Sequence, residues 1–264
     1  LYISDYRSGI AIYDITDIHA PQLLSKVDLE KYVRSSAYDN NYLYVANESY
    51  GLTIIDVTNP YVPVVKTSLP TPGQVYDVAV KGNYAYLADY SNGIVIVDIQ
   101  NKETPVIKGT LNSFTGYIYG IAADSYYAYL AEYGYTDTVK GFHIISTITK
   151  TNPTLKSSIT TSKSAYDIAI NGNFAYLADG TGGLAIIDIT SKTNPSLKGS
   201  LNTDSSSARS IAIDGTTAYL ANSSTGLYIA DVSQVATPIK LASLGFEKYV
   251  YHVFLHQDHA LLSA

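Results

Sequence analysis

The chain has 264 residues, a formal net charge of −6 and a hydrophobic content of 46%. A chain of this length and composition can bury a large core, so we expect an ordered globular protein. The negative charge argues against nucleic acid as the partner, because phosphates attract basic surfaces, and no apolar run is long enough for direct insertion into a membrane.

One sequence unit recurs along the whole chain. Its first half reads, in chain order, LYISD (1–5), LYVAN (43–47), AYLAD (85–89), AYLAE (128–132), AYLAD (175–179), AYLAN (218–222) and ALLSA (260–264). Its second half reads GIAIYDIT (9–16), GLTIIDVT (51–58), GIVIVDIQ (93–100), GFHIISTI (141–148), GLAIIDIT (183–190) and GLYIADVS (226–233). A proline follows every second half. The period is 42 to 43 residues, with one longer unit. This spacing predicts an architecture of stacked, similar units.

Each unit predicts four short strands, shown best by residues 164–201. YDIAI, FAYLAD and LAIIDIT are the first three, and the fourth opens at Pro195 and continues as SLKGSL. Runs of β-branched, aromatic and small residues between turn formers are typical of strands. The two middle strands are apolar on both faces, as expected when sheets stack on either side. The fourth strand, with its proline and alternating polar residues, is expected to be an exposed edge.

Four-stranded units of this length, repeated six or seven times around an axis, predict an all-β fold, the β-propeller with four-stranded antiparallel blades. The sequence supplies six first, third and fourth strands but seven second strands, so six blades are favoured and seven are the alternative. We expect residues 1–264 to form a single propeller domain. Because the chain starts at Leu1 inside a strand, we also expect it to have been excised from a longer chain.

The repeat itself points to a family. GLTIIDVTNPYVPVV (51–65) and VYDVAVKGNYAYLAD (75–89) resemble the LVIVD repeat family, named for the strand that reads GIVIVDI at 93–99. The resemblance implies a bacterial or archaeal propeller that is secreted or lies at the cell surface, and it implies no particular chemistry. The unit reading GFHIISTITKTNP departs most from the pattern, with Ser146 in place of aspartate.

Two aspartates of the unit at 173–190 are candidates for a catalytic carboxylate pair. In an antiparallel hairpin Asp179 lies roughly opposite Leu184, so Asp188 is about 13 Å away. Two-carboxylate glycosidases need roughly 5 to 9.5 Å. Similar residues recur in most units, whereas a catalytic residue is needed once. We therefore expect both aspartates to fix turns by accepting hydrogen bonds from backbone N–H groups.

The candidate ligand-binding residues lie at the start of the first strands, at one mouth of the expected central channel. Two of the three arginines of the chain belong to this set: Arg34, Tyr76, Tyr119, Tyr166, Arg209 and Tyr251, followed by Asp77, Asp167 and His252. Tyrosine rings can stack on sugars, and arginine can hold a carboxylate or sulfate. The alternative is that these side chains only fill the channel, with the arginines paired to Asp77 and Asp167.

One loop is longer than its equivalents. Glu132 and Ser146 are 14 positions apart, where the other units have 9, and the extra residues fall within EYGYTDTVKG (132–141). Loops that extend from a rigid scaffold often carry recognition residues. Tyr133 and Tyr135 therefore extend the candidate binding surface.

The remaining motifs predict little chemistry. His252 and His256 are about 13 Å apart on a strand, too far to share one metal ion, and His259 alone could fold back. We expect no catalytic residue, metal or cofactor, with calcium at acidic loop ends as the alternative. Asn47 and Asn222 begin N-glycosylation sequences at turns.

These observations favour a non-catalytic, extracellular or cell-surface propeller that binds or scaffolds a surface protein or a polysaccharide at one channel face. Two alternatives remain. One is a hydrolase, lyase or lactonase that uses Asp77, Asp167 and His252 at the channel mouth. The other is a structural surface module that associates with itself.

Overall fold

The computed structural model describes residues 1–29, 32–134, 141–203 and 206–263. Their regular structure consists of β-strands. None of the described residues belongs to a helix long and apolar enough to cross a membrane. The chain divides into two compact units, which we describe one at a time: residues 1–114, 123–128 and 147–154, and residues 115–122, 129–146 and 155–264.

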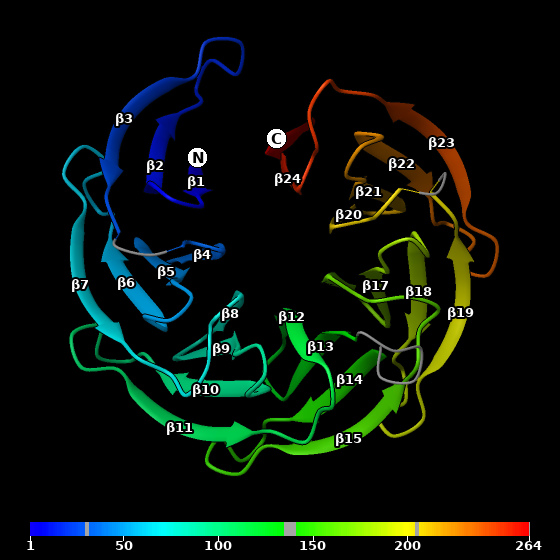
Figure 1. The fold of residues 1–264 in the computed structure, drawn as a ribbon, viewed down its shortest axis with the longest axis horizontal. Helices are drawn as coiled ribbons and strands as arrows, with labels where there is room; N and C mark the ends of the chain where they lie inside the picture. The colour runs from blue at the N-terminus through cyan, green and yellow to red at the C-terminus, as the bar shows by residue number, and fades with distance from the viewer. Residues whose placement is uncertain (30–31, 135–140, 204–205, 264) are drawn as a thin grey trace. The chain divides into compact units, whose positions relative to one another are not determined.

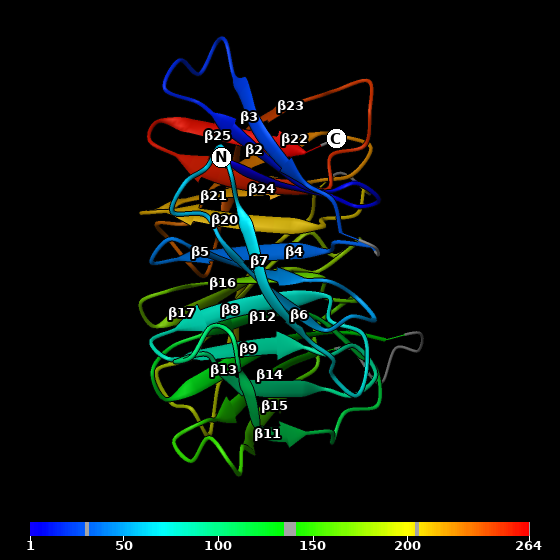
Figure 2. The ribbon, with the colours of Figure 1, turned by 90° about the vertical axis from the view of Figure 1, so that its left-hand side faces the viewer.

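The first unit contains three antiparallel sheets, whose strands lie side by side in both views (Figure 1 and Figure 2). One sheet has three strands and two have four. Their bounds are β1 Tyr2–Asp5, β2 Gly9–Asp14 and β3 Gln22–Val27; β4 Ser35–Asp39, β5 Tyr42–Ala46, β6 Leu52–Asp56 and β7 Val64–Leu69; β8 Asp77–Lys81, β9 Tyr84–Ala88, β10 Ile94–Asp98 and β11 Val106–Leu111.

The second unit continues the pattern with three four-stranded sheets and one two-stranded sheet. Some residues of the first of these sheets belong to the first unit. The bounds are β12 Tyr117–Ala123, β13 Tyr127–Tyr133, β14 Gly141–Ser146 and β15 Thr154–Ile159; β16 Asp167–Asn171, β17 Phe174–Ala178, β18 Leu184–Asp188 and β19 Ser196–Leu201; β20 Ser210–Asp214, β21 Thr217–Ala221, β22 Leu227–Asp231 and β23 Ile239–Leu244; β24 His252–His256 and β25 His259–Ser263.

These strands make a six-bladed β-propeller, as the repeat predicts. The described residues contain six first strands, from β4 to β24, and likewise six third and six fourth strands. Only the second-strand position is filled seven times, because β1 opens the chain and β25 closes it. The surplus strand β25 pairs with β24 in a two-stranded sheet.

The middle strands of each blade carry the core, which confirms the predicted burial. In the second unit Ile186 of β18 and Ala178 of β17 are fully buried, in one cluster with Leu220 of the next blade. The fourth strand is an edge, and Leu197 of β19 keeps half of its surface exposed. Each fourth strand begins one residue after its proline rather than at it, since proline has no N–H to offer the third strand.

The fourth strand also contains a feature that the sequence pattern did not predict. In five blades its pairing with the third strand shifts by one residue, as between Ile186 and Ile187 of β18. Such a bulge leaves one residue unpaired and increases the twist of the strand. In β19 the unpaired residue is Lys198, whose ammonium lies 3.4 Å from the Asp188 carboxylate.

Candidate functional site

The two aspartates of one hairpin lie at opposite ends of it. Ala178 pairs with Leu184 and Phe174 pairs with Asp188, so Asp179 follows one end of the hairpin while Asp188 stands at the other. The length of the hairpin therefore separates the two carboxylates, as the strand spacing predicts. The described carboxylates at the third-strand position accept a hydrogen bond from the backbone two residues on, as from Thr190 to Asp188 at 2.9 Å. That bond and the Thr190 hydroxyl lower the pKa of Asp188.

The aspartates at the ends of the second strands have a structural role that differs from the expected fixing of the adjacent turn. The Asp179 side chain does not hold its own hairpin turn but accepts hydrogen bonds from the loop that enters its blade: the hydroxyls of Thr161 and Ser162 at 2.7 and 2.8 Å, and the backbone N–H of Lys163 at 3.0 Å. Asp89 holds Thr71 and Gly73 in the same way. Burial raises the pKa of both carboxyl groups, against the opposing effect of these hydrogen bonds.

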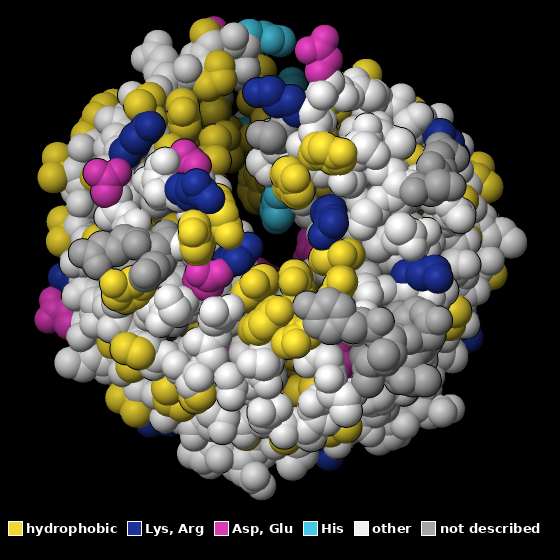
Figure 3. Space-filling model, in the orientation of Figure 1, with side chains coloured by type: hydrophobic (Ala, Val, Ile, Leu, Met, Phe, Trp, Pro, Cys, Tyr) yellow, Lys and Arg dark blue, Asp and Glu magenta, His cyan; other side chains and the backbone are white. Residues whose placement is uncertain are grey.

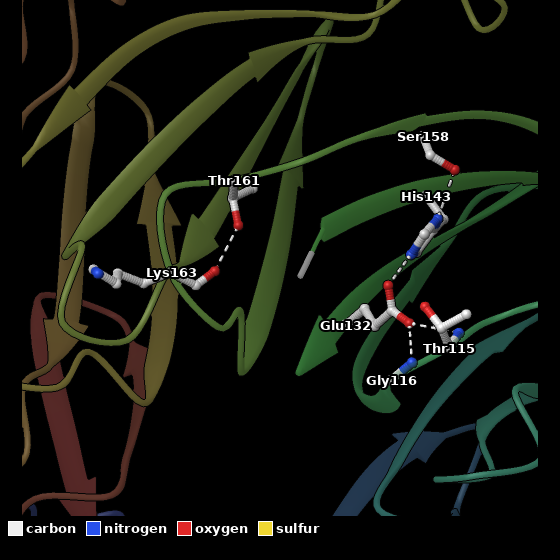
Figure 4. A network of polar contacts seen from close by, with 7 residues as sticks. All are labelled: Thr115, Gly116, Glu132, His143, Ser158, Thr161 and Lys163. Carbon is white, nitrogen blue, oxygen red and sulfur yellow. Dashed lines mark hydrogen bonds and ion pairs between the residues drawn. The ribbon is translucent and has the colours of Figure 1, made fainter. Parts of the chain in front are cut away.

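In the divergent blade the equivalent position is Glu132, which is buried and belongs to a polar network (Figure 4). One Glu132 oxygen accepts hydrogen bonds from the backbone of Thr115 and Gly116. The other lies 2.8 Å from Nε2 of His143, and Nδ1 of His143 lies 2.7 Å from the hydroxyl of Ser158. The order serine, histidine, carboxylate is also that of a hydrolytic triad.

The blade from β4 to β7 shows what this network does. At the same three positions it carries Asn47, Thr53 and Ser68, joined by hydrogen bonds of 3.2 and 2.9 Å. The two sets of side chains thus occupy the same positions on the second, third and fourth strands. We therefore interpret Glu132, His143 and Ser158 as a polar ladder that ties three strands together.

The Asn47 and Asn222 side chains are 3% and 0% exposed, so neither can accept a glycan in the folded protein.

Five of the residues predicted to bind a ligand stand directly before a first strand: Arg34, Tyr76, Tyr166, Arg209 and Tyr251. Asp77, Asp167 and His252 open first strands, Tyr119 lies within β12, and Tyr133 ends β13. Backbone pairing with the second strand fixes the five, as when the backbone N–H of Arg209 donates to Ala221 O at 2.8 Å and that of Tyr166 to Ala178 O at 2.9 Å. The strand pairing therefore places these side chains at one end of every blade. On the face drawn in Figure 3, hydrophobic side chains, which include tyrosines, lie next to basic ones.

In the first unit these residues form a cluster around Arg34. The guanidinium lies 2.6 Å from the Glu48 carboxylate and donates to the Tyr76 hydroxyl at 3.3 Å. It also stacks on the rings of Tyr6 and Tyr76, 4.7 and 4.4 Å from their centroids. Tyr76 in turn stacks on Tyr90 at 4.6 Å. The charge of Arg34 is thus neutralised by Glu48 and not by Asp77.

In the second unit the corresponding residues form a continuous row. Tyr119, Tyr133 and Tyr166 contact one another with centroid distances of 5.2 to 5.5 Å. The Arg209 guanidinium lies 4.1 Å from the centroid of Tyr166. Burial raises the pKa of Tyr166, and the Arg209 charge works in the opposite direction. We call Tyr119, Tyr133, Tyr166 and Arg209 the aromatic row; Tyr135 lies outside the described residues.

The carboxylates predicted at the first-strand starts have structural partners. Asp167 accepts hydrogen bonds from the backbone of Ile168 at 2.7 Å and of Ile211 in the next blade at 3.0 Å. Asp77 accepts from the backbone of Val78 at 2.8 Å. The alternative that the arginines pair with Asp77 and Asp167 is therefore wrong for Arg34, whose carboxylate is that of Glu48, and no such pair occurs for Arg209 among the described residues.

The C-terminal candidates lie on an exposed hairpin. Tyr251 is 56% exposed, and its ring is 6.4 Å from that of Tyr249. His252 opens β24 opposite Ser263, while His256 pairs with His259 across the turn. In the part of the chain that the structure describes, no group of three or more His, Cys, Asp or Glu side chains is arranged to hold a metal ion.

Sequence reasoning missed most of the turn residues that come directly after the Asp, Asn or Glu at the end of each second-strand motif, although their position in the repeat identifies them. The missed residues are Tyr6, Glu48, Tyr90, Gly180 and Ser223, whereas Tyr133 at the same position was predicted. In four of the described turns the carbonyl of the turn residue accepts a hydrogen bond from the residue before the next first-strand start, as from Ala208 to Gly180 at 2.9 Å and from Val250 to Ser223 at 3.0 Å. In the divergent blade Ala165 donates to Glu132 instead, at 3.3 Å. Arg209 therefore stands between Ser223, the turn residue of its own blade, and Gly180 of the preceding blade, as Arg34 stands between Glu48 and Tyr6.

Solved structures similar to this chain share its fold. A computationally designed protein, Ika8, matches with a TM-score of 0.74 and 11% identity over 99% of this chain and 76% of that one. The Cps50 (Swd1) β-propeller domain of Myceliophteria thermophila matches with a TM-score of 0.73 and 12% identity, over 94% and 84% of the two chains. A chain in a structure of the mitotic checkpoint complex matches with a TM-score of 0.75 and 15% identity, over 99% and 88%.

The sequence comparisons agree with the repeat. The family described as LVIVD repeat matches residues 32–71, 72–113, 162–203 and 205–243. The divergent blade falls outside the matched ranges. No curated protein matches the chain in sequence.

Proposed function

The chain belongs to the LVIVD repeat family, and we propose that it is a non-catalytic propeller that binds or scaffolds a protein or a polysaccharide, outside the cell or at its surface. The aromatic row carries this proposal. Three tyrosine rings in mutual contact, next to an arginine, offer stacking faces and a cation on one rigid scaffold. Such residues dominate the binding energy of recognition surfaces.

The state of the acidic residues supports binding rather than catalysis. The carboxylates of Asp167, Asp179 and Glu132 each accept two or more hydrogen bonds from the chain itself. A carboxylate used in this way stabilises the fold and is a weaker general base, since part of its lone pairs already accept hydrogen bonds.

The proposal is tested by removing rings from the row. We expect Tyr166→Ala and Tyr119→Ala to weaken binding to a panel of immobilised neutral and acidic polysaccharides by about tenfold, as stacking contacts of roughly 1 to 2 kcal/mol are lost. Tyr61→Ala is the control, because Tyr61 is 65% exposed in a turn next to a fourth strand. Equal binding by all three variants and the unaltered chain would contradict the assignment of this surface.

A further inference from the structure

The two arginines at the first-strand starts occupy the same position in the repeat but differ in their surroundings. Arg34 has Glu48 as the turn residue of its own blade, and the two form an ion pair of 2.6 Å. The turn residue equivalent to Glu48 in the blade of Arg209 is Ser223. Among the described residues, no side chain forms a hydrogen bond or an ion pair with Arg209. Within the described residues, the fold therefore neutralises Arg34 and supplies no carboxylate to Arg209.

The preceding blade adds a second difference. For Arg34 the turn residue of the preceding blade is Tyr6, whose ring centroid lies 4.7 Å from the guanidinium carbon and covers one side of the group. Arg209 follows Gly180, which has no side chain, and the ring of Tyr166 approaches the position that a Gly180 Cβ would take to within 3.3 Å. Arg209 is thus flanked by glycine and serine, the two smallest turn residues of the series, and among the described residues its guanidinium stacks on the Tyr166 ring.

This geometry fixes the guanidinium and leaves its edge available. Stacking on a ring uses the face of the guanidinium plane, whereas the N–H groups point outward within that plane. The Nε atom of Arg209 is buried without a hydrogen-bond partner, so the inner end of the group is already out of water. A planar, oriented cation of this kind suits a carboxylate or sulfate, which accepts two parallel N–H bonds.

We propose that Arg209 binds the carboxylate or sulfate group of an acidic sugar, while the tyrosines of the aromatic row stack on the sugar rings. This inference rests on the proposed function and narrows its ligand to acidic polysaccharides. The site is local, because the chain as a whole carries a net charge of −6 and repels polyanions at long range. Recognition must therefore come from direct contact with Arg209 rather than from the overall field of the protein.

The test compares matched polymers that differ only in charge. The probes are polygalacturonate against its methyl ester, and dextran sulfate against dextran, each measured with the complete chain. We expect about tenfold tighter binding of at least one acidic member than of its neutral counterpart, and the pair that shows it identifies carboxylate or sulfate. Equal binding within both pairs, or no binding of any probe, would overturn the inference.

Two variants assign the preference to Arg209 by different routes. Arg209→Gln removes the charge. Ser223→Glu places a carboxylate beside Arg209, at the position that Glu48 occupies beside Arg34. Both should abolish the preference for the acidic probe, and their thermal unfolding should show a folded protein. Arg7→Gln is the control, since it makes the same change of charge at an exposed residue outside the row and should keep the preference. A preference retained in both site variants would contradict the assignment.

The result separates this inference from the proposed function. If Tyr166→Ala removes binding of neutral and acidic probes alike while Arg209→Gln changes neither, the aromatic row binds its ligand without an anionic contact. In that case the role of Arg209 is wrong and the binding surface stands.

Discussion

At the residue scale, one position of the repeat is occupied by aspartate in some blades and by asparagine in others. Asp179 and Asn222 both follow the second strand, and both are buried and bonded to a threonine of the loop that enters their blade, Thr161 and Thr203 respectively. The aspartate must lose the hydration of its charge to reach this place, whereas asparagine makes the equivalent contact as a neutral group. The amide is therefore the less costly solution at neutral pH.

This difference predicts the pH dependence of stability. Burial raises the pKa of Asp179 in the folded state. A carboxyl group with a raised pKa contributes stability below its unfolded pKa, and that contribution is lost as the pH rises through the folded pKa. We expect the free energy of unfolding in urea to fall less from about pH 4 to about pH 7 in Asp179→Asn than in the unaltered chain.

The control for this experiment is the other aspartate of the hairpin. Hydrogen bonds from Thr190 lower the pKa of Asp188, so its contribution is present above the unfolded pKa and is lost as the pH falls. Asp188→Asn should therefore change the pH profile in the opposite sense. Parallel profiles for the two variants would contradict the burial argument.

At the scale of the elements, neighbouring blades are joined by contacts that repeat with the sequence. Lys192 donates to Ile189 O at 2.7 Å and lies 5.4 Å from the Tyr129 ring centroid in the preceding blade. The Ser157 hydroxyl donates to Lys192 O at 2.8 Å. In the next pair of blades the residues equivalent to Lys192 and Ser157 are Val235 and Gly199, and Gly199 has no side chain that could donate to the Val235 carbonyl. These contacts align one blade with the next.

Gly199 therefore permits a close approach that no other residue allows. A Cβ atom at this position would lie 2.1 Å from the Val235 carbonyl oxygen, so either β19 or the turn that contains Val235 must move. We expect Gly199→Ala to lower the free energy of unfolding by about 1 to 3 kcal/mol, the usual cost of overpacking. Gly245→Ala is the control in chemical denaturation, because a Cβ there meets nothing within 4 Å. Equal stability of the two variants would contradict the contact.

At the scale of the whole molecule, composition restricts which partners can bind without a specific site. The net charge of −6 and an isoelectric point near 5.2 leave the protein anionic at neutral pH. We expect no shift of duplex DNA in a gel at low salt, where basic proteins bind phosphates most strongly. A shift that weakens with added salt would show that a basic surface outweighs the net charge.

The fold could be predicted from the sequence to a large extent because the sequence unit that forms a blade recurs six times. Alternation of apolar strands and turn residues, with a proline at a constant distance, specified four strands per blade and the exposed fourth strand. The bulge at Lys198 could not be predicted, because it depends on how the twisted third and fourth strands meet. The role of Asp179 was also misjudged, since the loop that it holds begins 18 residues earlier in the chain.

For the site, the sequence by itself determined which residues stand at the first-strand starts, since strand pairing follows from local pattern. It did not distinguish Arg34 from Arg209, which have the same place in the repeat. Only the tertiary structure decided that Glu48 neutralises Arg34 and that the Tyr166 ring supports Arg209. The physical reason is that the charge state of a site depends on side chains brought together across hairpins and between blades, at distances that no periodicity encodes.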